Sequence, residues 1–456
     1  MIPQQVMERT KRSIGKGEEQ IDRLSALPDD VVCYILSFLP TKQSMATSIL
    51  SSRWRFLWTH VPILDFPFTS FSLSDVSVID TTHSDIIHRV ILLHRAEKLN
   101  SFSFFSIRCT EYQLETWINI AIDRNVRNLD ICPSKRVRLP RHLFTCKTLV
   151  ELKLTNCNNR PLINVAAVSL PSLKKLHLCG VRFQVEEDIA HLLSGCPVLE
   201  HLVVDHVYII KYGNLRIFSP TIVWLELNYM FEFFLLDNRN YRLNVNAPAL
   251  RYLKLHDFSD DPNVSSFKHI SFSPMTSLIE ADINVHTCSI DEDDYYSTRS
   301  GVEFFNFLSN VKCLKLSGPY PVKVLQVASA GSNLRFDNLS KLEVKLDVDW
   351  RFVTKLLEMA DNLEVLIVGA DETYWMEPKQ VPTCLSSRIR TIRIDRMTCT
   401  KPGFNMVRYF LRNAGALEKM EIFSRLLGTE SKRNFDALQR MSLFEVGSKA
   451  CQLAFY

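Results

Sequence analysis

A three-point pattern, apolar-x-x-apolar-x-apolar, recurs thirteen times between Leu99 and Ile422. Neighbouring triplets follow one another at nearly regular intervals along this part of the chain. Each triplet predicts a short strand whose alternate side chains point into a shared core, because a single repeat cannot bury its own apolar face. Thirteen triplets in near-register therefore predict a solenoid of stacked parallel strands.

The intervals average about 26 residues, within the range of about 20 to 29 residues that is typical of leucine-rich repeats. The triplets are Leu99-Phe102-Phe104, Val126-Leu129-Ile131, Leu149-Leu152-Leu154, Leu173-Leu176-Leu178, Leu199-Leu202-Val204, Ile222-Leu225-Leu227, Leu250-Leu253-Leu255, Leu278-Ala281-Ile283, Val311-Leu314-Leu316, Leu339-Leu342-Val344, Leu363-Leu366-Val368, Ile389-Ile392-Ile394 and Leu417-Met420-Ile422. Some intervals hold an amphipathic helical pattern, in residues 185–202, 302–314, 353–366 and 406–420, and others a loop that contains proline. The predicted fold class is α/β, an irregular arc with helices and loops on its outer face.

The segment before the repeats, residues 22–66, has the pattern of three short helices with a large apolar surface. Pro28 suits the first turn of a helix, where Asp29 and Asp30 place negative charge at the positive end of the helix dipole. Thr41 is expected to cap a second helix, and the third predicted helix, residues 53–58, is crowded with aromatic side chains. A segment of this size cannot bury so much apolar surface alone, so the following chain or another protein must cover it.

The residues LPDDVVCYILSFLPTK and SILSSRWRFLW within this segment strongly resemble the F-box, in the form common in plant proteins with leucine-rich repeats. Val31-Val32 departs from the Ile-Leu that is frequent there, and Ser52 from the usual Lys or Arg. The resemblance implies docking on a Skp-type adaptor, which links the chain to cullin and RING subunits of a ubiquitin ligase. The implied adaptor-binding residues are Leu27, Pro28, Ile35, Leu36, Leu39, Pro40, Leu50, Ser51, Trp54 and Trp58. The alternative is a helical cap that closes the end of the following domain.

The C-terminal part of the chain has a second resemblance. VPTCLSSRIRTIRIDRMTCTKPGFNMVRYFLRNAGALEKMEIF and the closing FEVGSKACQLAFY look like the FBD region of plant F-box proteins. The expected domains are a flexible leader (1–20), the F-box (21–66), a connection (67–85), the solenoid (86–380) and the FBD-like region (381–456). We expect the last region to continue and cap the solenoid, with an independent binding module as the alternative.

Composition and charge limit the classes of partner. The net charge is +4, from 54 basic and 50 acidic residues with no long basic block, so nucleic acid is not implied. No run of 18 apolar residues occurs, and the polar N-terminus has no signal-peptide core. We therefore expect no membrane association and a cytoplasmic or nuclear location.

No motif of an enzyme, a metal site or a cofactor site is visible. The phosphate loop, the G-x-S-x-G elbow and H-E-x-x-H are absent from the sequence, and the twelve cysteines include no C-x-x-C. We expect buried free thiols, no cofactor and no catalysis by this chain. The spacing of His83, His88 and His94 does not fit metal ligands on one helical face, so surface or capping positions are expected. The acidic residues 291–294 are expected to form a solvated loop.

The exposed sides of the strands are the predicted target-binding surface. Residues that flank the middle of each triplet point away from the core, and stacking aligns them in columns. One predicted column is Glu151, Lys175, His201, Trp224, Tyr252 and Glu280, and the next is Lys153, His177, Val203, Glu226, Lys254 and Asp282. The predicted target-binding residues are Trp224, Glu226, Tyr252, Lys254 and His256, since aromatic residues beside charges favour interfaces. Alternatively, a neighbouring loop covers Trp224 and Tyr252.

These features favour a substrate-recognition subunit of an SCF-type (Skp–cullin–F-box) ubiquitin ligase, in which the repeat arc holds a protein target. Catalysis would then rest on proximity, and this chain needs no active-site residue. Two alternatives stay open at this point. One is an adaptor-bound scaffold that does not promote ubiquitination, and the other is a receptor that senses a small molecule on the repeat surface.

Overall fold

The computed structural model describes residues 24, 26–67, 76–105, 109–133, 137–155, 168–185, 187–206, 208–209, 214–229, 242–257, 269–285, 302–318, 325, 334–345, 350–369, 375–397, 400–424 and 439–456. The predicted leader (1–20), residues 68–75 of the predicted connection and the acidic residues 291–294 lie outside these ranges.

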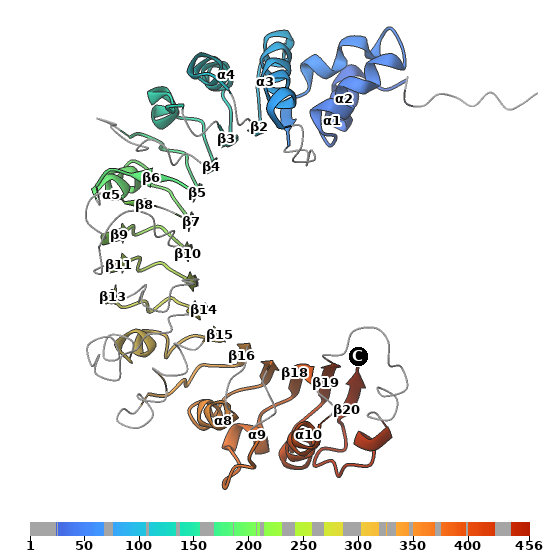
Figure 1. The fold of residues 1–456 in the computed structure, drawn as a ribbon, viewed down its shortest axis with the longest axis vertical. Coiled ribbons are helices and arrows are strands. Elements are labelled where there is room, and N and C mark those ends of the chain that lie inside the picture. Colours follow the sequence, from blue (N-terminus) through green and yellow to red (C-terminus); the bar gives the residue numbers. More distant parts are fainter. Residues whose placement is uncertain are drawn as a thin grey trace, which may run out of the picture.

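Within the described residues, one parallel sheet of fifteen strands follows the arc, and each strand pairs with its neighbours in the order of the chain. Its strands line the inner side of the arc, with the F-box-like segment at one end and the C-terminus at the other (Figure 1). They are β1 (Ile63–Phe66), β2 (Ser101–Phe105), β3 (Asn128–Cys132), β4 (Glu151–Thr155), β5 (Lys175–Cys179), β7 (His201–Asp205), β10 (Trp224–Tyr229), β12 (Tyr252–Asp257), β14 (Glu280–Val285), β15 (Cys313–Ser317), β16 (Lys341–Lys345), β17 (Val365–Gly369), β18 (Thr391–Met397), β19 (Lys419–Ser424) and β20 (Gln452–Phe455).

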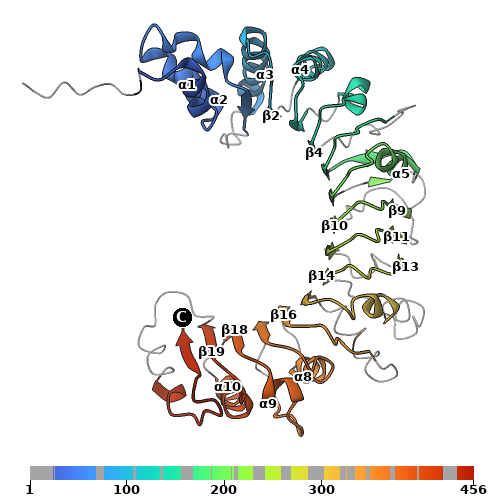
Figure 2. The same ribbon diagram turned by 180° about the vertical axis from the view of Figure 1, so that it is seen from behind.

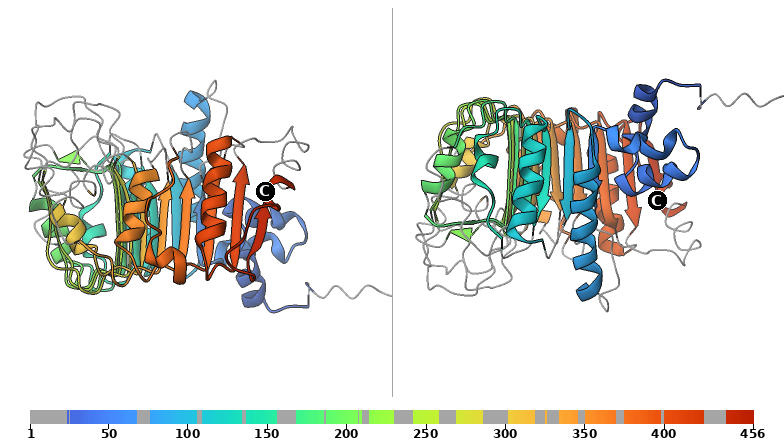
Figure 3. Two further views of the ribbon diagram at one scale, coloured as in Figure 1. Left: turned by 90° about the horizontal axis from the view of Figure 1, so that it is seen from below. Right: turned by 90° about the horizontal axis from the view of Figure 1, so that it is seen from above.

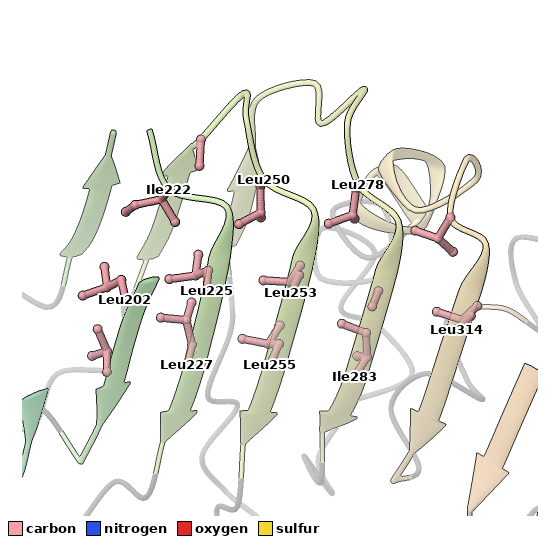
Figure 4. Packing of buried hydrophobic residues seen from close by; sticks show 14 of the residues in the cluster. Leu202, Ile222, Leu225, Leu227, Leu250, Leu253, Leu255, Leu278, Ile283 and Leu314 are labelled. Carbon is pink, nitrogen blue, oxygen red and sulfur yellow. The ribbon is translucent and has the colours of Figure 1, made fainter. Parts of the chain in front are cut away.

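The thirteen predicted triplets coincide with strands of this sheet, from β2 to β19. The last two residues of each triplet lie on a strand, and the first lies just before it. Every triplet residue is at most 3% exposed. Side chains such as Leu225, Leu253 and Ile283 project from neighbouring strands to the same side, where they form one continuous core (Figure 4). The pattern therefore predicted strand positions and core residues correctly, because a shared core requires the same side-chain alternation in every repeat.

Two further strands extend the sheet beyond the predicted triplets. β1 pairs with β2 and carries the buried residues Leu64 and Phe66, preceded by buried Val61, which repeats the triplet spacing inside the segment assigned to the F-box. β20 pairs with β19 at the other end. The sheet thus begins before residue 86 and continues through the FBD-like region.

Helices and short strands cover the outer side of the arc (Figure 2). Seen from above, α3 and α4 run alongside the strands in front of the sheet (Figure 3). The outer elements are α3 (Val76–Leu93), α4 (Glu111–Asp123), η3 (Arg141–Thr145), β6 (Arg182–Phe183), α5 (Glu187–Ser194), β8 (Tyr208–Ile209), β9 (Asn214–Phe218), β11 (Arg242–Asn246), β13 (His269–Phe272), α8 (Trp350–Glu358), α9 (Thr383–Ser387) and α10 (Lys401–Asn413). Helical residues 302–307, α5, α8 and α10 confirm the four predicted helical intervals.

The F-box-like segment folds into α1 (Asp29–Leu36), α2 (Thr41–Ala46), η1 (Thr47–Ile49) and η2 (Trp54–His60). α1 begins after Pro28 and carries Asp29 and Asp30 in its first turn, as predicted. Thr41 does not cap α2, because Pro40 holds that position. Instead, the Thr41 hydroxyl accepts a hydrogen bond of 2.7 Å from the backbone N–H of Asp65 in β1, which ties the helical segment to the first strand.

A buried histidine joins the F-box-like segment to the solenoid. His94 directly follows α3, which fits a capping position, but only 2% of the residue is exposed. Burial lowers its pKa to about 4, so the ring is neutral: Nε2 donates to the carbonyl oxygen of Val61 at 2.8 Å, and Nδ1 accepts from Arg124 Nη1 at 2.7 Å. The expectation of a surface position was wrong for His94, because both ring nitrogens form hydrogen bonds inside this junction.

Candidate functional site

One face of α1 exposes apolar side chains to solvent. Val31, Tyr34, Ile35 and Phe38 recur at helical spacing, and 71% of Phe38 is exposed. Tyr34 and Phe38 meet edge to face, with ring centroids 5.0 Å apart. A helix with one apolar face in a core and another in water is incompletely covered within its own chain, which favours a partner at this face.

A second exposed apolar group follows at η1 and η2. The exposed fractions are 87% for Ile49, 66% for Leu50 and 56% for Phe56. In the described residues, the large apolar side chains with more than a third of their surface in water number twenty, and eight of them lie between Leu24 and Phe56. The exposed apolar surface is therefore concentrated in the F-box-like segment.

The predicted adaptor-binding residues fall into three groups by their burial in the structure. Leu36, Trp54 and Trp58 are buried, and Leu27, Leu39 and Pro40 are partly buried. Pro28, Ile35, Leu50 and Ser51 are exposed. Leu36 and Trp54 pack in the core of the module and Trp58 packs in the core of the sheet, so these three side chains offer little surface to a partner.

Several exposed apolar side chains of this segment were not among the predicted contacts, namely Val31, Tyr34, Phe38, Ile49 and Phe56. The spacing of 31, 34 and 35 on α1, continued by 38 in the turn after the helix, marks this face in the sequence. Motif positions alone do not reveal which apolar residues face inward, because the module buries Val32, Leu36 and Trp54 in its own small core.

An ion pair fixes the start of α1 against η2. Arg53 donates from Nε to Asp29 Oδ1 at 2.9 Å, and its Nη2 donates to the same oxygen at 2.6 Å. Nη2 also donates to the backbone oxygen of Leu27. These bonds hold the residues that surround the exposed face of α1.

The predicted columns on the concave face are confirmed by the strand register. Trp224 lies opposite His201 on one side and Tyr252 on the other, and Glu226 lies opposite Lys254. The Trp224 and Tyr252 rings stack with centroids 3.6 Å apart, and His201 stacks on the other face of Trp224 at 5.9 Å. All three side chains are half-buried, so part of each ring remains accessible to a partner.

Polar and charged side chains on this face pair across neighbouring strands. Lys254 Nζ lies 3.3 Å from Glu226 Oε2, and His256 Nε2 lies 3.0 Å from Asp282 Oδ1. Trp224 Nε1 donates to the second oxygen of Glu226 at 2.8 Å. Burial, with the charges of Asp282 and Glu226, raises the pKa of Tyr252 to about 12, so its hydroxyl keeps its proton at neutral pH. The five predicted target-binding residues thus lie on one surface of alternating charge.

Three family models match separate parts of the chain. The F-box domain model matches residues 24–66, the model for the leucine-rich repeats of FBD-associated F-box protein At5g56370 matches residues 114–344, and the FBD model matches residues 377–422. In this order, the three spans correspond to the helical segment, the middle of the sheet and the C-terminal part of the sheet. Where the structure describes the chain, no helix has the length and apolar character needed to cross a membrane.

Relatives of similar length occur in Arabidopsis thaliana. Putative FBD-associated F-box protein At5g56440 is 32% identical over 95% of this chain and 100% of its own length. Putative F-box/FBD/LRR-repeat protein At4g00315 is 31% identical over 96% of this chain and 100% of its own length. FBD-associated F-box protein At5g38590 is 32% identical over 89% of this chain and 94% of its own length.

Proposed function

Because the chain belongs to the plant F-box/FBD/leucine-rich-repeat family, we propose that it is the substrate-recognition subunit of an SCF-type ubiquitin ligase. The observation that carries the proposal is the concentration of exposed apolar side chains on the F-box. In this role the F-box binds a Skp-type adaptor, and through it the cullin and RING subunits. The concave face of the arc holds a protein target, and a separate enzyme transfers ubiquitin.

Adaptor binding in this proposal is driven by apolar burial. Complete removal of a large apolar side chain from water contributes about 1.5–3 kcal/mol, so the exposed apolar side chains together supply a large part of the binding free energy. Phe38, Ile49 and Leu50 are the most exposed members. The buried residues Leu36 and Trp54 act indirectly, because they support the helices that present this surface.

The junction between the F-box and the arc supports transfer by proximity. Backbone N–H groups of Arg95 and Ala96 both donate to the Thr59 carbonyl, at 2.7 and 3.1 Å, beside the His94 contacts. Trp58 packs into the core of the sheet rather than that of the F-box. A joint held by these contacts keeps the target at a constant position relative to the adaptor, and this raises the effective concentration of target lysines at the ligase.

The concave face is proposed to bind the target through Trp224, Glu226, Tyr252, Lys254 and His256. Cross-strand pairs balance the charges there, as with Lys315 and Glu280, whose Nζ and Oε1 atoms are 2.6 Å apart. A surface of alternating sign suits a folded protein or peptide with both charges better than a polyanion. This supports a protein target.

Co-purification with a Skp-type adaptor tests the proposal. Ile49→Ala with Leu50→Ala should weaken adaptor capture by about 100-fold, since two truncations each remove roughly 1.5 kcal/mol of apolar burial. Tyr34→Ala with Phe38→Ala tests the α1 face in the same way. The matched control is Leu92→Ala with Leu93→Ala, an adjacent apolar pair on α3 with exposures of 59% and 58%.

Failure of the wild-type chain to capture the adaptor would overturn the proposal. Equal loss in the Leu92/Leu93 control would indicate non-specific adhesion. If the wild type captures the adaptor but no cullin, the scaffold role replaces the ligase role. Circular dichroism of each variant confirms that the fold is retained.

A further inference from the structure

Three side chains that commonly bind metals meet at the ends of β5 and β7. Cys179 closes β5, Asp205 closes β7, and His206 follows directly. Their ligand atoms all lie within 4.8 Å of one another, and the three residues are half-buried. Cys179 and Asp205 alternate with the buried residues Leu178 and Val204, so they lie on the concave side of the sheet. Cys179 and Asp205 belong to different repeats, and the alignment of their triplets places them opposite each other.

Asp205 stands between the thiol and the imidazole. Its Oδ2 lies 3.7 Å from Cys179 Sγ. Sulfur and oxygen ligands at about 2.3 and 2.0 Å from a tetrahedral zinc ion are separated by about 3.5 Å, so the observed distance needs little adjustment. Asp205 Oδ1 is buried and faces His206 Nδ1, with which it forms an ion pair when the ring is protonated. A cation that took the place of the imidazole proton would bind the carboxylate and the ring nitrogen together.

The backbone around the cluster is held in place. His206 has a φ of 49°, a left-handed conformation that costs energy for a residue other than glycine. Its N–H donates to the carbonyl of Asn228 at 3.1 Å. Gly180, with a φ of 60°, donates its N–H to the carbonyl of Asp205 at 2.9 Å. These bonds hold the two strand ends together, so the three ligands start close to one another, and His206 Nδ1 must move away from Asp205 Oδ1 to admit an ion between them.

We propose that Cys179, Asp205 and His206 form a Zn²⁺ site on the concave side of the solenoid. Sulfur, imidazole and carboxylate ligands together suit zinc, whereas Mg²⁺ and Ca²⁺ prefer oxygen alone. The thiol loses its proton to solvent when the ion binds. Three protein ligands leave a fourth position for water or for a donor atom of a bound protein. The bound ion would also link the two repeats.

Zinc titration of the metal-stripped full-length chain against a chromophoric chelator tests the site. The wild type should bind one tight equivalent, and Co²⁺ in its place should give the thiolate charge-transfer and tetrahedral absorption bands. Cys179→Ser and His206→Gln should each weaken binding at least tenfold. The matched controls are Cys313→Ser, another half-buried thiol on a strand of the sheet, and His201→Gln on β7 itself.

Several outcomes would overturn the site. The first is that the wild type binds no tight equivalent of zinc. The second is that the Cys179 and His206 variants bind zinc as tightly as the wild type. The third is that the two control variants lose as much affinity as the site variants. Binding of Mg²⁺ as tight as that of Zn²⁺ would also contradict the assignment. Because the titration needs neither adaptor nor target, its result is independent of the proposed ligase role.

Discussion

The F-box and the concave face of the arc offer opposite kinds of surface. The F-box buries six apolar residues in its own core and exposes a larger set, which includes Phe38, Ile49 and Leu50. The concave face exposes polar and aromatic side chains that already stack or pair with one another, such as Trp224 with Tyr252. A partner of the F-box gains affinity by covering apolar surface, whereas a partner of the concave face must compete with contacts that exist in the free chain.

This difference predicts different consequences of mutation. Truncation in the F-box core should unfold a small module, because few other contacts compensate. Truncation on the concave face should leave the fold almost unchanged and alter recognition alone.

The largest effect is expected for Leu36→Ala in the F-box core. Leu36 is 1% exposed, and loss of a buried leucine side chain costs about 3 kcal/mol. Hydrogen exchange of backbone N–H groups in residues 29–60 should accelerate by about 100-fold, while exchange in β10, β12 and β14 stays unchanged. Leu253→Ala is the matched control within the sheet, and it should leave exchange in residues 29–60 unaltered. A uniform acceleration along the whole chain would contradict a separate F-box core.

The next largest effect concerns acid and the junction of the two regions. The pKa of His94 is about 4 in the folded chain and about 6.5 in the unfolded chain. Burial lowers it most, the charges of Arg124 and His60 lower it further, and the hydrogen bond to Val61 acts in the opposite direction. Below about pH 6.5 the unfolded chain therefore binds a proton that the folded chain does not. Stability should fall by about 2 kcal/mol between pH 7 and pH 5 from this group, and the loss should end near pH 4.

Chemical denaturation of the wild type and of His94→Gln at both pH values measures this contribution. On acidification the wild type should lose about 2 kcal/mol more than the variant, although the variant is less stable at pH 7. His142→Gln, in η3, controls for general effects of removing a histidine. Equal acid sensitivity of the wild type and His94→Gln would mean that His94 does not titrate as its burial implies.

A smaller effect on stability is expected for Trp224→Ala together with Tyr252→Ala. The stacking itself contributes about 1 kcal/mol, and the apolar burial lost with the two rings is limited because both are partly exposed. Adaptor binding should be unchanged, while mass spectrometry should find fewer target proteins co-purified with the variant. Loss of adaptor and target together would indicate misfolding and would remove the contrast between the two regions.

The smallest effect is expected for Lys315→Met. Lys315 pairs with Glu280 at 2.6 Å, and both side chains retain more than a quarter of their exposure. Half-exposed ion pairs contribute between 0 and about 1 kcal/mol, and salt screens them. A double-mutant cycle with Glu280→Gln, measured by urea denaturation at low and high salt, gives the coupling. A coupling well above about 1 kcal/mol would mean that the concave face is stabilised by its ion pairs.

Local sequence patterns determined most of the arc. The thirteen triplets predicted thirteen strands and their buried residues, and the amphipathic intervals predicted outer helices such as α5 and α10, because side-chain alternation and helical spacing are local properties. The pattern missed β1, since its residues were assigned to the F-box. The motif also placed Leu36, Trp54 and Trp58 among the adaptor contacts, although they are buried.

Only the tertiary structure decided which chemistry-bearing residues meet. The contacts of His94 with Val61 and Arg124 join positions that are distant in the sequence. The alignment of the triplets already places Cys179 opposite Asp205, but the approach of His206 to the same carboxylate depends on the left-handed backbone at the end of β7. Burial or exposure of each F-box side chain depends in the same way on how three short helical pieces pack together.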